Sequence, residues 1–376
     1  SDVQSLSPTL LEGYLNAAAA VSRMAIGDRK APVGQATYKT SPFASQHPWD
    51  HVDGTPYGTR GGLVLLHTFP ADGEFACSDP DLALKQLIME AGSDIAILEP
   101  THSEARVPEA TAAFCTAINL WLANHWLDPH NNWHERWRGS ICVSIEAPDL
   151  AAAEIEKWAE HPYMAQILIK AERRPSWGHP MYNPIWAAAT KYDIPVSCHL
   201  GRGQFETLPI PPVGFPSYNH DFMVTYSLLA ANQVMSMIFD GLFDRFPTLR
   251  IVFVEHAFTW ILPLMWRMDA IYEARKGWLD IKRKPSEYVK DHIKFTTQPL
   301  DYPEDKTELL RAFEWMECEK ILLFSSDYPH WTFDDPRWLV KHLPEHAREA
   351  VMFRNGINTY HLPDTVPALE GQVRVF

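Results

Sequence analysis

The stretch Arg138–Lys170, RGSICVSIEAPDLAAAEIEKWAEHPYMAQILIK, decides the fold. It holds an apolar run at Arg138–Ile145, a helical pattern at Asp149–Glu160 and a second apolar run at Ala165–Lys170. Asp149 has the side chain of a helix N-cap. Runs rich in Ile, Val and Leu are typical of strands covered on both faces, and strands that alternate with helices indicate a parallel sheet. The stretch therefore predicts a strand, a helix and a second strand of an α/β fold.

The same alternation continues on both sides of this stretch. A helical pattern covers Pro108–Leu127, and five more strands are predicted at Ser93–Pro100, Pro195–His199, Arg250–Glu255, Ile293–Thr297 and Lys320–Ser325. Seven such strands and one near the N-terminus would close an eightfold barrel, so we predict a (β/α)8 TIM-like barrel as a single domain over residues 1–376. A doubly wound open sheet is the competing arrangement.

Two segments do not follow this rhythm. Residues 16–75 are rich in Gly, Pro and small polar residues, with HPWDHVDGTPYGTRGG at their centre. A loop of this length in a compact domain is functional or a partner surface, so we interpret it as a long N-terminal excursion from the barrel. Residues 361–376 have the composition of an extended tail.

The composition excludes several classes of function. The chain has 376 residues, 46% of them hydrophobic, and a net charge of −14, which argues against a nucleic-acid partner. It has no apolar run of about 18 residues and no signal segment, so we expect a cytoplasmic protein without a membrane segment. The five cysteines are scattered and lack C-x-x-C spacing, which indicates neither a disulfide framework nor a thiolate zinc site.

Three polar residues follow predicted strands directly. His199 follows PVSC, His256 follows RIVFVE, and Asp327 follows ILLFSS. The carboxyl ends of parallel barrel strands surround the active-site mouth. Imidazole and carboxylate are ligands of Zn, Mn and Fe, so we predict one divalent metal held by His199, His256 and Asp327. Taken singly, each is also typical of a hydrogen-bonded core histidine or a helix N-cap.

Longer motifs add a resemblance to a known family. FSSDYPHWTFDDP at Phe324–Pro336 closely resembles the last-strand signature of the amidohydrolase-related, decarboxylase-like family. Similar motifs are AINLWLANHWLD (Ala117–Asp128), FDGLFDRFPTLRIVFVE (Phe239–Glu255), MWRMD (Met265–Asp269) and PSEYVKDHIKFTTQPLD (Pro285–Asp301). The similarity covers nearly the whole chain beyond residue 90. It implies a (β/α)8 barrel, one divalent metal or sometimes two, and a decarboxylase, hydratase or hydrolase activity.

The resemblance also implies roles for single residues. His199 matches the fifth-strand ligand, and Asp327 matches the last-strand carboxylate that binds metal or handles a proton. His256 matches a sixth-strand histidine of the wider superfamily, and we predict that it and Asp327 are catalytic. The family's first-strand pair of histidines has no counterpart, because the matching positions are Gln4 and Leu6.

Further candidates surround this set. Arg202 in Gly201-Arg202-Gly203 is predicted to pair with a substrate carboxylate. His330 is also predicted to contact the substrate, either lining the mouth or holding the loop. Glu99 and His102, at the end of ILEPTHS, are candidates for contacts around the metal or the substrate.

Other residues receive a structural interpretation. Lys170 ends a strand where some amidohydrolases carry a carboxylated lysine, but a salt-bridged lysine is the favoured interpretation. On the N-terminal excursion, surface contacts are favoured over metal binding for His47, Asp50, His51 and Asp53.

Two functional hypotheses follow. The first makes the chain a subunit of a hetero-oligomeric metal-dependent enzyme, because it resembles the paired amidohydrolase-fold subunits of 2-aminoisobutyric acid hydroxylase, a monooxygenase. Its partner would be a homologous amidohydrolase-fold subunit that keeps the full ligand set. The second makes it a self-sufficient metal-dependent decarboxylase or hydrolase that acts on a small carboxylic acid, with a second copy of itself as the partner. The missing first-strand pair favours the first hypothesis.

Overall fold

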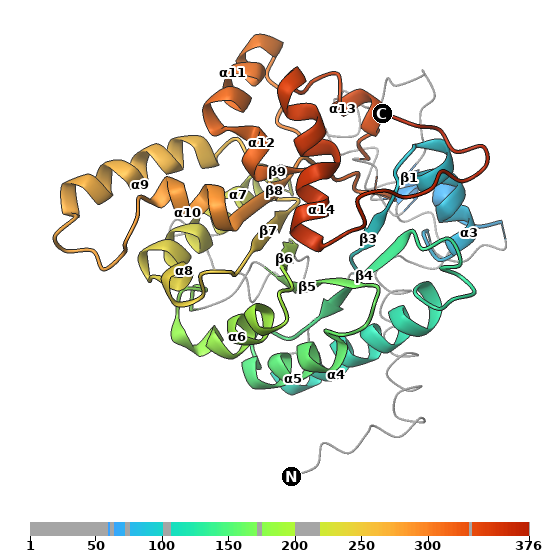
Figure 1. The fold of residues 1–376 in the computed structure, drawn as a ribbon, viewed down its shortest axis with the longest axis horizontal. Helices are drawn as coiled ribbons and strands as arrows, with labels where there is room; N and C mark the ends of the chain where they lie inside the picture. Colours follow the sequence, from blue (N-terminus) through green and yellow to red (C-terminus); the bar gives the residue numbers. More distant parts are fainter. Residues whose placement is uncertain are drawn as a thin grey trace.

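Seven parallel strands, in chain order, form one curled sheet with helices on its outer side (Figure 1). The computed structural model describes residues 59–60, 64–71, 76–100, 107–170, 175–199, 219–330 and 333–375. The strands are β3 (Ala96–Leu98), β4 (Trp137–Cys142), β5 (Met164–Lys170), β6 (Val196–His199), β7 (Ile251–Val254), β8 (Ile293–Thr296) and β9 (Leu322–Leu323). A doubly wound sheet would reverse its strand order, whereas each strand here neighbours the next in the chain. The predicted TIM-like barrel is confirmed, with seven of its strands inside the described residues.

Helices connect successive strands. The longer ones are α4 (Pro108–Trp121), α5 (Pro148–Trp158), α6 (Asn183–Lys191), α7 (Asn219–Phe239), α9 (Ile261–Arg275), α10 (Pro285–His292) and α11 (Lys306–Met316). Shorter segments are α3 (Pro80–Ala83), α8 (Leu242–Arg245), α12 (Cys318–Ile321), α13 (Pro336–Leu339) and α14 (Asn355–Tyr360). Turns of other helical type are η2 (Leu66–Thr68), η3 (Leu84–Glu90), η4 (Leu122–Trp126), η5 (Pro180–Tyr182), η6 (Glu345–Ala347) and η7 (Ala350–Arg354).

One predicted helix start is wrong. Helix α5 begins at Pro148 with Ala147 as its N-cap, so Asp149 lies inside the first turn. Proline fits the first helical position because its missing N–H has no partner there in any helix. Asp149 still favours the helix, since a carboxylate in the first turn interacts well with the helix dipole.

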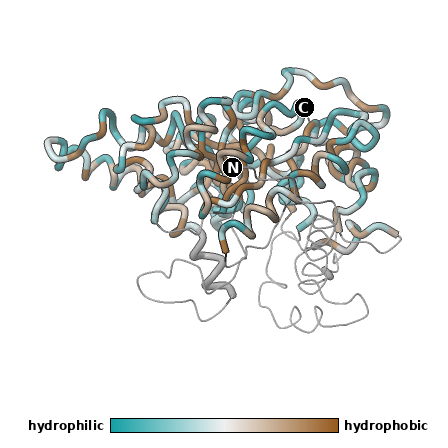
Figure 2. The backbone as a smooth tube through the Cα atoms, turned by 90° about the horizontal axis from the view of Figure 1, so that it is seen from below, coloured by the Kyte–Doolittle hydropathy of each residue, from teal (hydrophilic) through white to brown (hydrophobic). Residues whose placement is uncertain are grey.

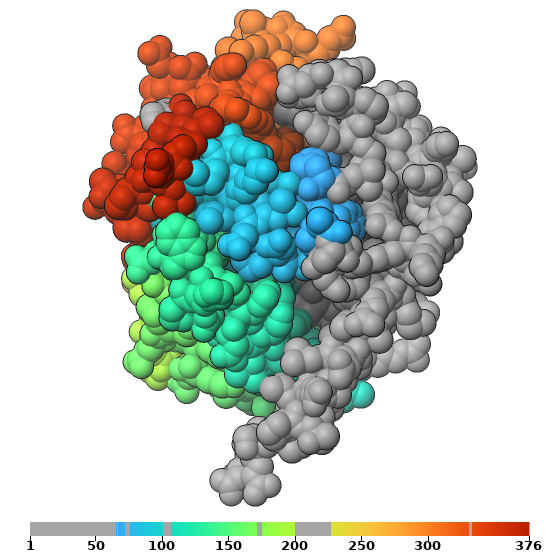
Figure 3. Space-filling model, turned by 90° about the vertical axis from the view of Figure 1, so that its right-hand side faces the viewer, coloured from blue at the N-terminus to red at the C-terminus, as the bar shows by residue number. Residues whose placement is uncertain are grey.

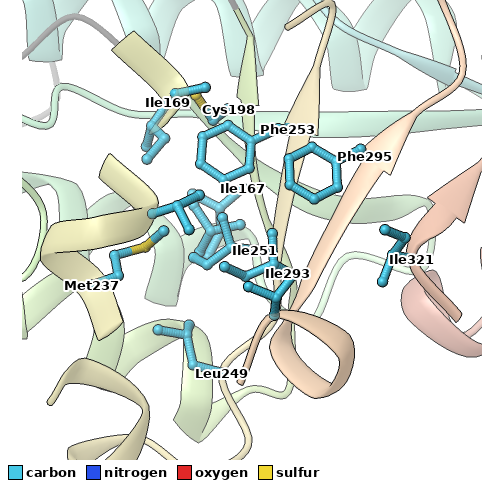
Figure 4. Close-up of a cluster of buried hydrophobic side chains, with 14 of the residues drawn as sticks. Ile167, Ile169, Cys198, Met237, Leu249, Ile251, Phe253, Ile293, Phe295 and Ile321 are labelled. Atoms are coloured by element: carbon cyan, nitrogen blue, oxygen red, sulfur yellow. The ribbon is translucent and has the colours of Figure 1, made fainter. Parts of the chain in front are cut away.

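The hydrophobic core fills the layer between the sheet and the helices. Ile167, Ile251, Phe253, Ile293 and Phe295 are wholly buried and point from their strands into this layer (Figure 4). The Phe253 and Phe295 rings stack at 5.5 Å. Hydrophobic chain segments concentrate at the centre of the molecule and hydrophilic ones around it (Figure 2). Burial of each such side chain stabilises the fold by about 1.5–3 kcal/mol.

The C-terminal segment packs against η3 and the loop that leads from it into β3. Val373 N–H donates to Met89 O at 2.9 Å, and Arg374 Nη1 lies 2.7 Å from Asp94 Oδ1. Gly92 has φ +85°, and a Cβ there would come within 2.9 Å of Val373 O. Figure 3 shows the C-terminal part of the chain, in red, beside the part coloured cyan, which includes these residues. Residues 361–375 contain neither helix nor strand, and hydrogen bonds from Val373 and Arg374 tie their end to η3 and this loop.

Little of the predicted N-terminal excursion is described. A short antiparallel pair, β1 (Thr59–Arg60) and β2 (Val64–Leu65), lies within it, and Leu65 N–H donates to Pro329 O at 3.0 Å. The rest of residues 16–75, apart from 66–71, lies outside the described residues. Within the described part of the chain, no helix is long and apolar enough to cross a membrane.

Candidate metal centre

Acidic and imidazole side chains gather at the carboxyl ends of the strands. Glu99 follows β3, His199 ends β6, and Glu255 follows β7. His199 Nε2 lies 3.0 Å from Glu255 Oε2 and 4.0 Å from Glu99 Oε2. Their side chains are mostly buried, with 14–17% exposure. These strand ends form the mouth of a parallel barrel, where a site for chemistry is expected.

Asp327, in the loop after β9, is held through both of its oxygens. Its Oδ1 lies 2.6 Å from His330 Nδ1, and its Oδ2 accepts a hydrogen bond from Gln298 Nε2 at 3.0 Å. Ligand atoms of Glu255, Asp327 and His330 all lie within 4.8 Å of one another. Three ligand atoms this close can be bridged by a single divalent cation.

Burial and charge pull the pKa values of this cluster in different directions. Burial raises the pKa of Glu99 more than His199 and the Gln166 hydrogen bond lower it. Burial also opposes ionisation of Glu255, but its contacts with His199 and the nearby His330 lower its pKa to about 2. Burial lowers the pKa of His330, yet Asp327 and Glu255 raise it further, for a net increase. Three carboxylates therefore share a mostly buried volume with two imidazoles, and a cation would balance their charge.

The backbone is strained where these groups project. Glu255 has φ 62°, Ala257 has φ 53°, and Asp327 has φ 59°. Non-glycine residues in this left-handed region cost roughly 1–2 kcal/mol each and concentrate at functional sites. The strain turns the chain sharply at two strand ends, and both turns present a carboxylate of the cluster.

His256 lies beside the cluster but is not one of the three clustered residues. Its Nδ1 lies 2.8 Å from Val254 O, and its ring packs edge-on against Phe253. Because Nδ1 donates to a carbonyl, Nε2 is unprotonated, and it has no hydrogen-bond partner in the described part of the protein. Burial and the charge of His199 lower the pKa of His256 to about 3, so it is neutral. Its predicted roles as ligand and catalyst stay predictions.

The remaining predicted residues divide into two groups. Lys170 pairs in register with His199 at the ends of neighbouring strands, and Glu99 faces His199 across the mouth. Outside the described residues lie Arg202 and His102, the first-strand positions Gln4 and Leu6, and the loop residues His47, Asp50, His51 and Asp53.

Glu255 and Gln298 were not predicted as site residues from the sequence. Glu255 ends RIVFVE, as His199 ends PVSCH, so its position at the end of a strand was an available signal. Gln298 follows the strand IKFTT in the same way. His330 lies in direct contact with Asp327, and its predicted contact with the substrate stays a prediction.

Comparisons with known proteins agree with this picture. The amidohydrolase family profile matches residues 44–362. No curated protein matches the chain.

Solved structures with the same fold include several decarboxylases. The 5-carboxyvanillate decarboxylase of Sphingomonas paucimobilis has a TM-score of 0.57 and 20% identity, over 74% of this chain and 83% of that one. The Rhizobium 2,6-dihydroxybenzoate decarboxylase has a TM-score of 0.58 and 18% identity, over 76% and 88%. The 5-carboxyvanillate decarboxylase of Novosphingobium aromaticivorans, solved with bound manganese, has a TM-score of 0.61 and 16% identity, over 94% of both chains. At these identities the likeness shows the fold.

Proposed function

Because the chain belongs to the amidohydrolase family, we propose that it is a metal-dependent decarboxylase or hydrolase of a small carboxylic acid. The observation that carries the proposal is the cluster of Glu255, Asp327 and His330 at the strand ends. His199, 3.0 Å from Glu255, would complete the ligand set. This set shares His199 and Asp327 with the set predicted from the sequence.

The donors fit a divalent metal of the first transition row. Carboxylate and imidazole together suit Zn, Mn and Fe, and the similar decarboxylase from N. aromaticivorans was solved with manganese. Two mostly buried carboxylates as close as those of Glu255 and Asp327 cannot both ionise freely unless a cation or a proton lies between them. A single metal would remove this conflict.

A bound metal would polarise substrate oxygens or lower the pKa of a bound water. The protein's own side chains would orient the ligands and hold a proton. Gln298 fixes Oδ2 of Asp327, which leaves Oδ1 to share a proton with Nδ1 of His330. Decarboxylation replaces a carboxylate by a proton on the same carbon. The Asp327–His330 pair is the proton source that the geometry favours.

The charge of the site supports a carboxylic acid as substrate only when the metal is present. Glu99, Glu255 and Asp327 would repel an anion from the mouth. A divalent metal with His199 and His330 offsets this repulsion and offers the substrate carboxylate a counter-charge. Arg202, predicted to contact that carboxylate, lies outside the described residues. The similar decarboxylases act on aromatic carboxylates, as their names state, so these are the first compounds to test.

The hypothesis of a hetero-oligomeric enzyme stays a prediction. It depends on Gln4 and Leu6, which lie outside the described residues. A homologous partner subunit and a monooxygenase activity have no support from the described site, so the self-sufficient enzyme is the function we propose.

An activity assay tests the proposal. Protein loaded with Mn²⁺ or Zn²⁺ is incubated with a panel of hydroxybenzoates and small hydroxy acids, and CO₂ release and ester or amide hydrolysis are followed. We expect turnover that falls at least about 100-fold in Asp327→Asn, because a metal ligand and one member of the proton-donating pair are lost. Asp305→Asn, at the exposed N-cap of α11, is the control and should retain activity.

Two outcomes would contradict the proposal. One is full turnover in Asp327→Asn. The other is the absence of turnover in fully loaded protein until a homologous chain is added, which would favour the companion-subunit hypothesis.

A further inference from the structure

Three consecutive polar residues at the carboxyl end of β8, Thr296, Thr297 and Gln298, are almost wholly buried, with at most 6% exposure. Burial of a polar side chain costs free energy unless hydrogen bonds satisfy it. Strand β8 lies between β7 and β9, the two strands that lead to Glu255 and Asp327. The three residues therefore lie between the strand ends that carry two carboxylates of the candidate metal centre.

Thr296 binds the backbone turn that presents Glu255. The register of β7 and β8 ends at Phe253 and Phe295, so Glu255 lies beyond the strand pairing. Its N–H donates to Thr296 Oγ1 at 3.2 Å. That hydroxyl donates in turn to Gln298 O at 3.2 Å, with Phe253 O at 3.5 Å as the more distant acceptor. The Thr296 side chain thus takes over, for the amide of Glu255, the role that a strand carbonyl has within the sheet.

Gln298 binds the carboxylate of Asp327 directly, through Nε2, which donates to Oδ2 at 3.0 Å. The backbone of Gln298 is held as well, because its N–H donates to Ser325 Oγ at 3.2 Å. Ser325 N–H donates to Thr297 Oγ1 at 3.2 Å, and Thr297 N–H donates to Leu323 O at 2.9 Å. These bonds extend the contact between β8 and β9 past the end of both strands, toward the turn at Asp327.

Both turns need contacts of this kind to keep their shape. Glu255 and Asp327 have φ of 62° and 59°, and a non-glycine residue persists in the left-handed region only where its surroundings hold it there. Their carboxylate oxygens also lie within 4.8 Å of each other, so the two charges repel. Without the hydrogen bonds from β8, the turns would be expected to relax and the carboxylates to separate.

We propose that Thr296 and Gln298 are positioning residues that hold the Glu255 and Asp327 carboxylates at the separation that one divalent metal requires. The inference rests on the proposed function, because these carboxylates matter here as metal ligands. Thr296 acts through the amide of Glu255, and Gln298 acts through Oδ2 of Asp327. Removal of a group that orients a ligand typically weakens metal binding by about 10–100-fold.

The Mn²⁺ affinity of matched variants tests the inference. The dissociation constant is measured by chelator competition for wild type, Thr296→Val, Thr296→Ser and Gln298→Met, together with the melting temperature of each. Valine keeps the shape of threonine but lacks the hydroxyl, whereas serine keeps the hydroxyl. We expect binding about 10-fold weaker in Thr296→Val and in Gln298→Met, and within about twofold of wild type in Thr296→Ser.

A matched control separates positioning from general stability. Thr116→Val makes the same change in the helical layer, where the Thr116 hydroxyl donates to Glu154 Oε2 at 2.7 Å between α4 and α5. These helices lie on the outer side of the sheet (Figure 1). Thr116→Val should lower the melting temperature about as much as Thr296→Val and leave the Mn²⁺ affinity unchanged.

The outcomes are distinct. Unchanged affinity in Thr296→Val or in Gln298→Met would overturn the role of that residue, while wild-type binding upholds the metal centre. A loss in Thr296→Ser or in Thr116→Val as large as that in Thr296→Val would show general destabilisation and overturn the positioning role of Thr296. If Thr296→Val does not fold, Gln298→Met decides the inference. Wild-type protein that binds no Mn²⁺ or Zn²⁺ would overturn the metal centre and this inference with it.

Discussion

The two ends of the barrel strands differ in how their charged side chains are balanced. At the amino ends, Asp193 lies between Arg250 and His361, at 2.6 and 3.0 Å, and its side chain is half exposed. At the carboxyl ends, Glu99, Glu255 and Asp327 share a mostly buried space with His199 and His330. The amino end is thus balanced by its own side chains, whereas the carboxyl end has an excess of negative charge.

The difference distinguishes charged groups that have little effect on stability from charged groups that reduce stability and belong to the candidate site. Exposed, balanced ion pairs contribute little and tolerate change. Buried acidic groups and strained backbone cost stability, and they persist where a site requires them. The following predictions test this division, beginning with the largest expected change in stability.

A substitution in the packed layer beneath the mouth should cause the largest loss of stability. Phe253→Ala should lower the free energy of unfolding by about 3–5 kcal/mol, because the wholly buried ring stacks on both Trp177 and Phe295. Chemical denaturation measures the loss. A loss below about 1 kcal/mol would show that this layer is not the core that supports the site.

The buried acid beside the mouth should destabilise the protein as pH rises. Burial and the charge of Asp327 raise the pKa of Asp334 to about 8, and its Oδ2 has no hydrogen-bond partner in the described residues. In the unfolded chain the group ionises above about pH 4, but in the folded protein it stays neutral up to about pH 8. The protein therefore loses no stability through Asp334 below pH 4, and the free energy of unfolding declines as the pH rises from 4 toward 8.

Asp334→Asn should remove this slope. In the metal-free protein at pH 8, we expect this substitution to raise the free energy of unfolding by about 2–5 kcal/mol. The gain should shrink toward zero at pH 4. Thermal unfolding across this range measures it. Asp335→Asn is the neighbouring control, because Asp335 caps α13 and pairs with Arg337, and it should show no such gain. A gain that does not depend on pH would contradict the assignment.

A substitution at the amino ends of the strands should change stability least. Asp193→Asn should cost no more than about 1 kcal/mol, since its ion pairs are exposed and salt screens them. Asparagine also tolerates the φ of 54° at this position. Unfolding at low and high salt tests this, and a loss above about 2 kcal/mol would mean that the two ends differ less than we infer.

The sequence predicted the barrel and the edge at which the site lies, for a physical reason. Apolar strands such as RIVFVE end abruptly in polar residues, and parallel topology brings those ends together. That reasoning located His199 and Asp327 and extends to Glu255. It does not determine which side chains meet across strands, because distances depend on sheet twist and on backbone turns at residues such as Glu255 and Asp327.

The surroundings of two other residues could not be predicted from local sequence patterns. The ring of His256 is oriented by Val254 O and Phe253, contacts that the residue type does not reveal. Tyr360 packs against Val252, Val254 and Leu323 from the C-terminal helix α14, which carries no motif. Both depend on tertiary packing, which local sequence does not encode.

Metal stoichiometry tests the central claim most directly. Wild type and Asp327→Asn are loaded with excess Mn²⁺ or Zn²⁺, desalted and analysed for metal per chain, with Asp305→Asn as the control. We expect about one equivalent of metal per chain in wild type and in the control, and less than about a tenth in Asp327→Asn. Wild type without metal, or equal metal in Asp327→Asn, would contradict a metal centre at the carboxyl ends of the strands.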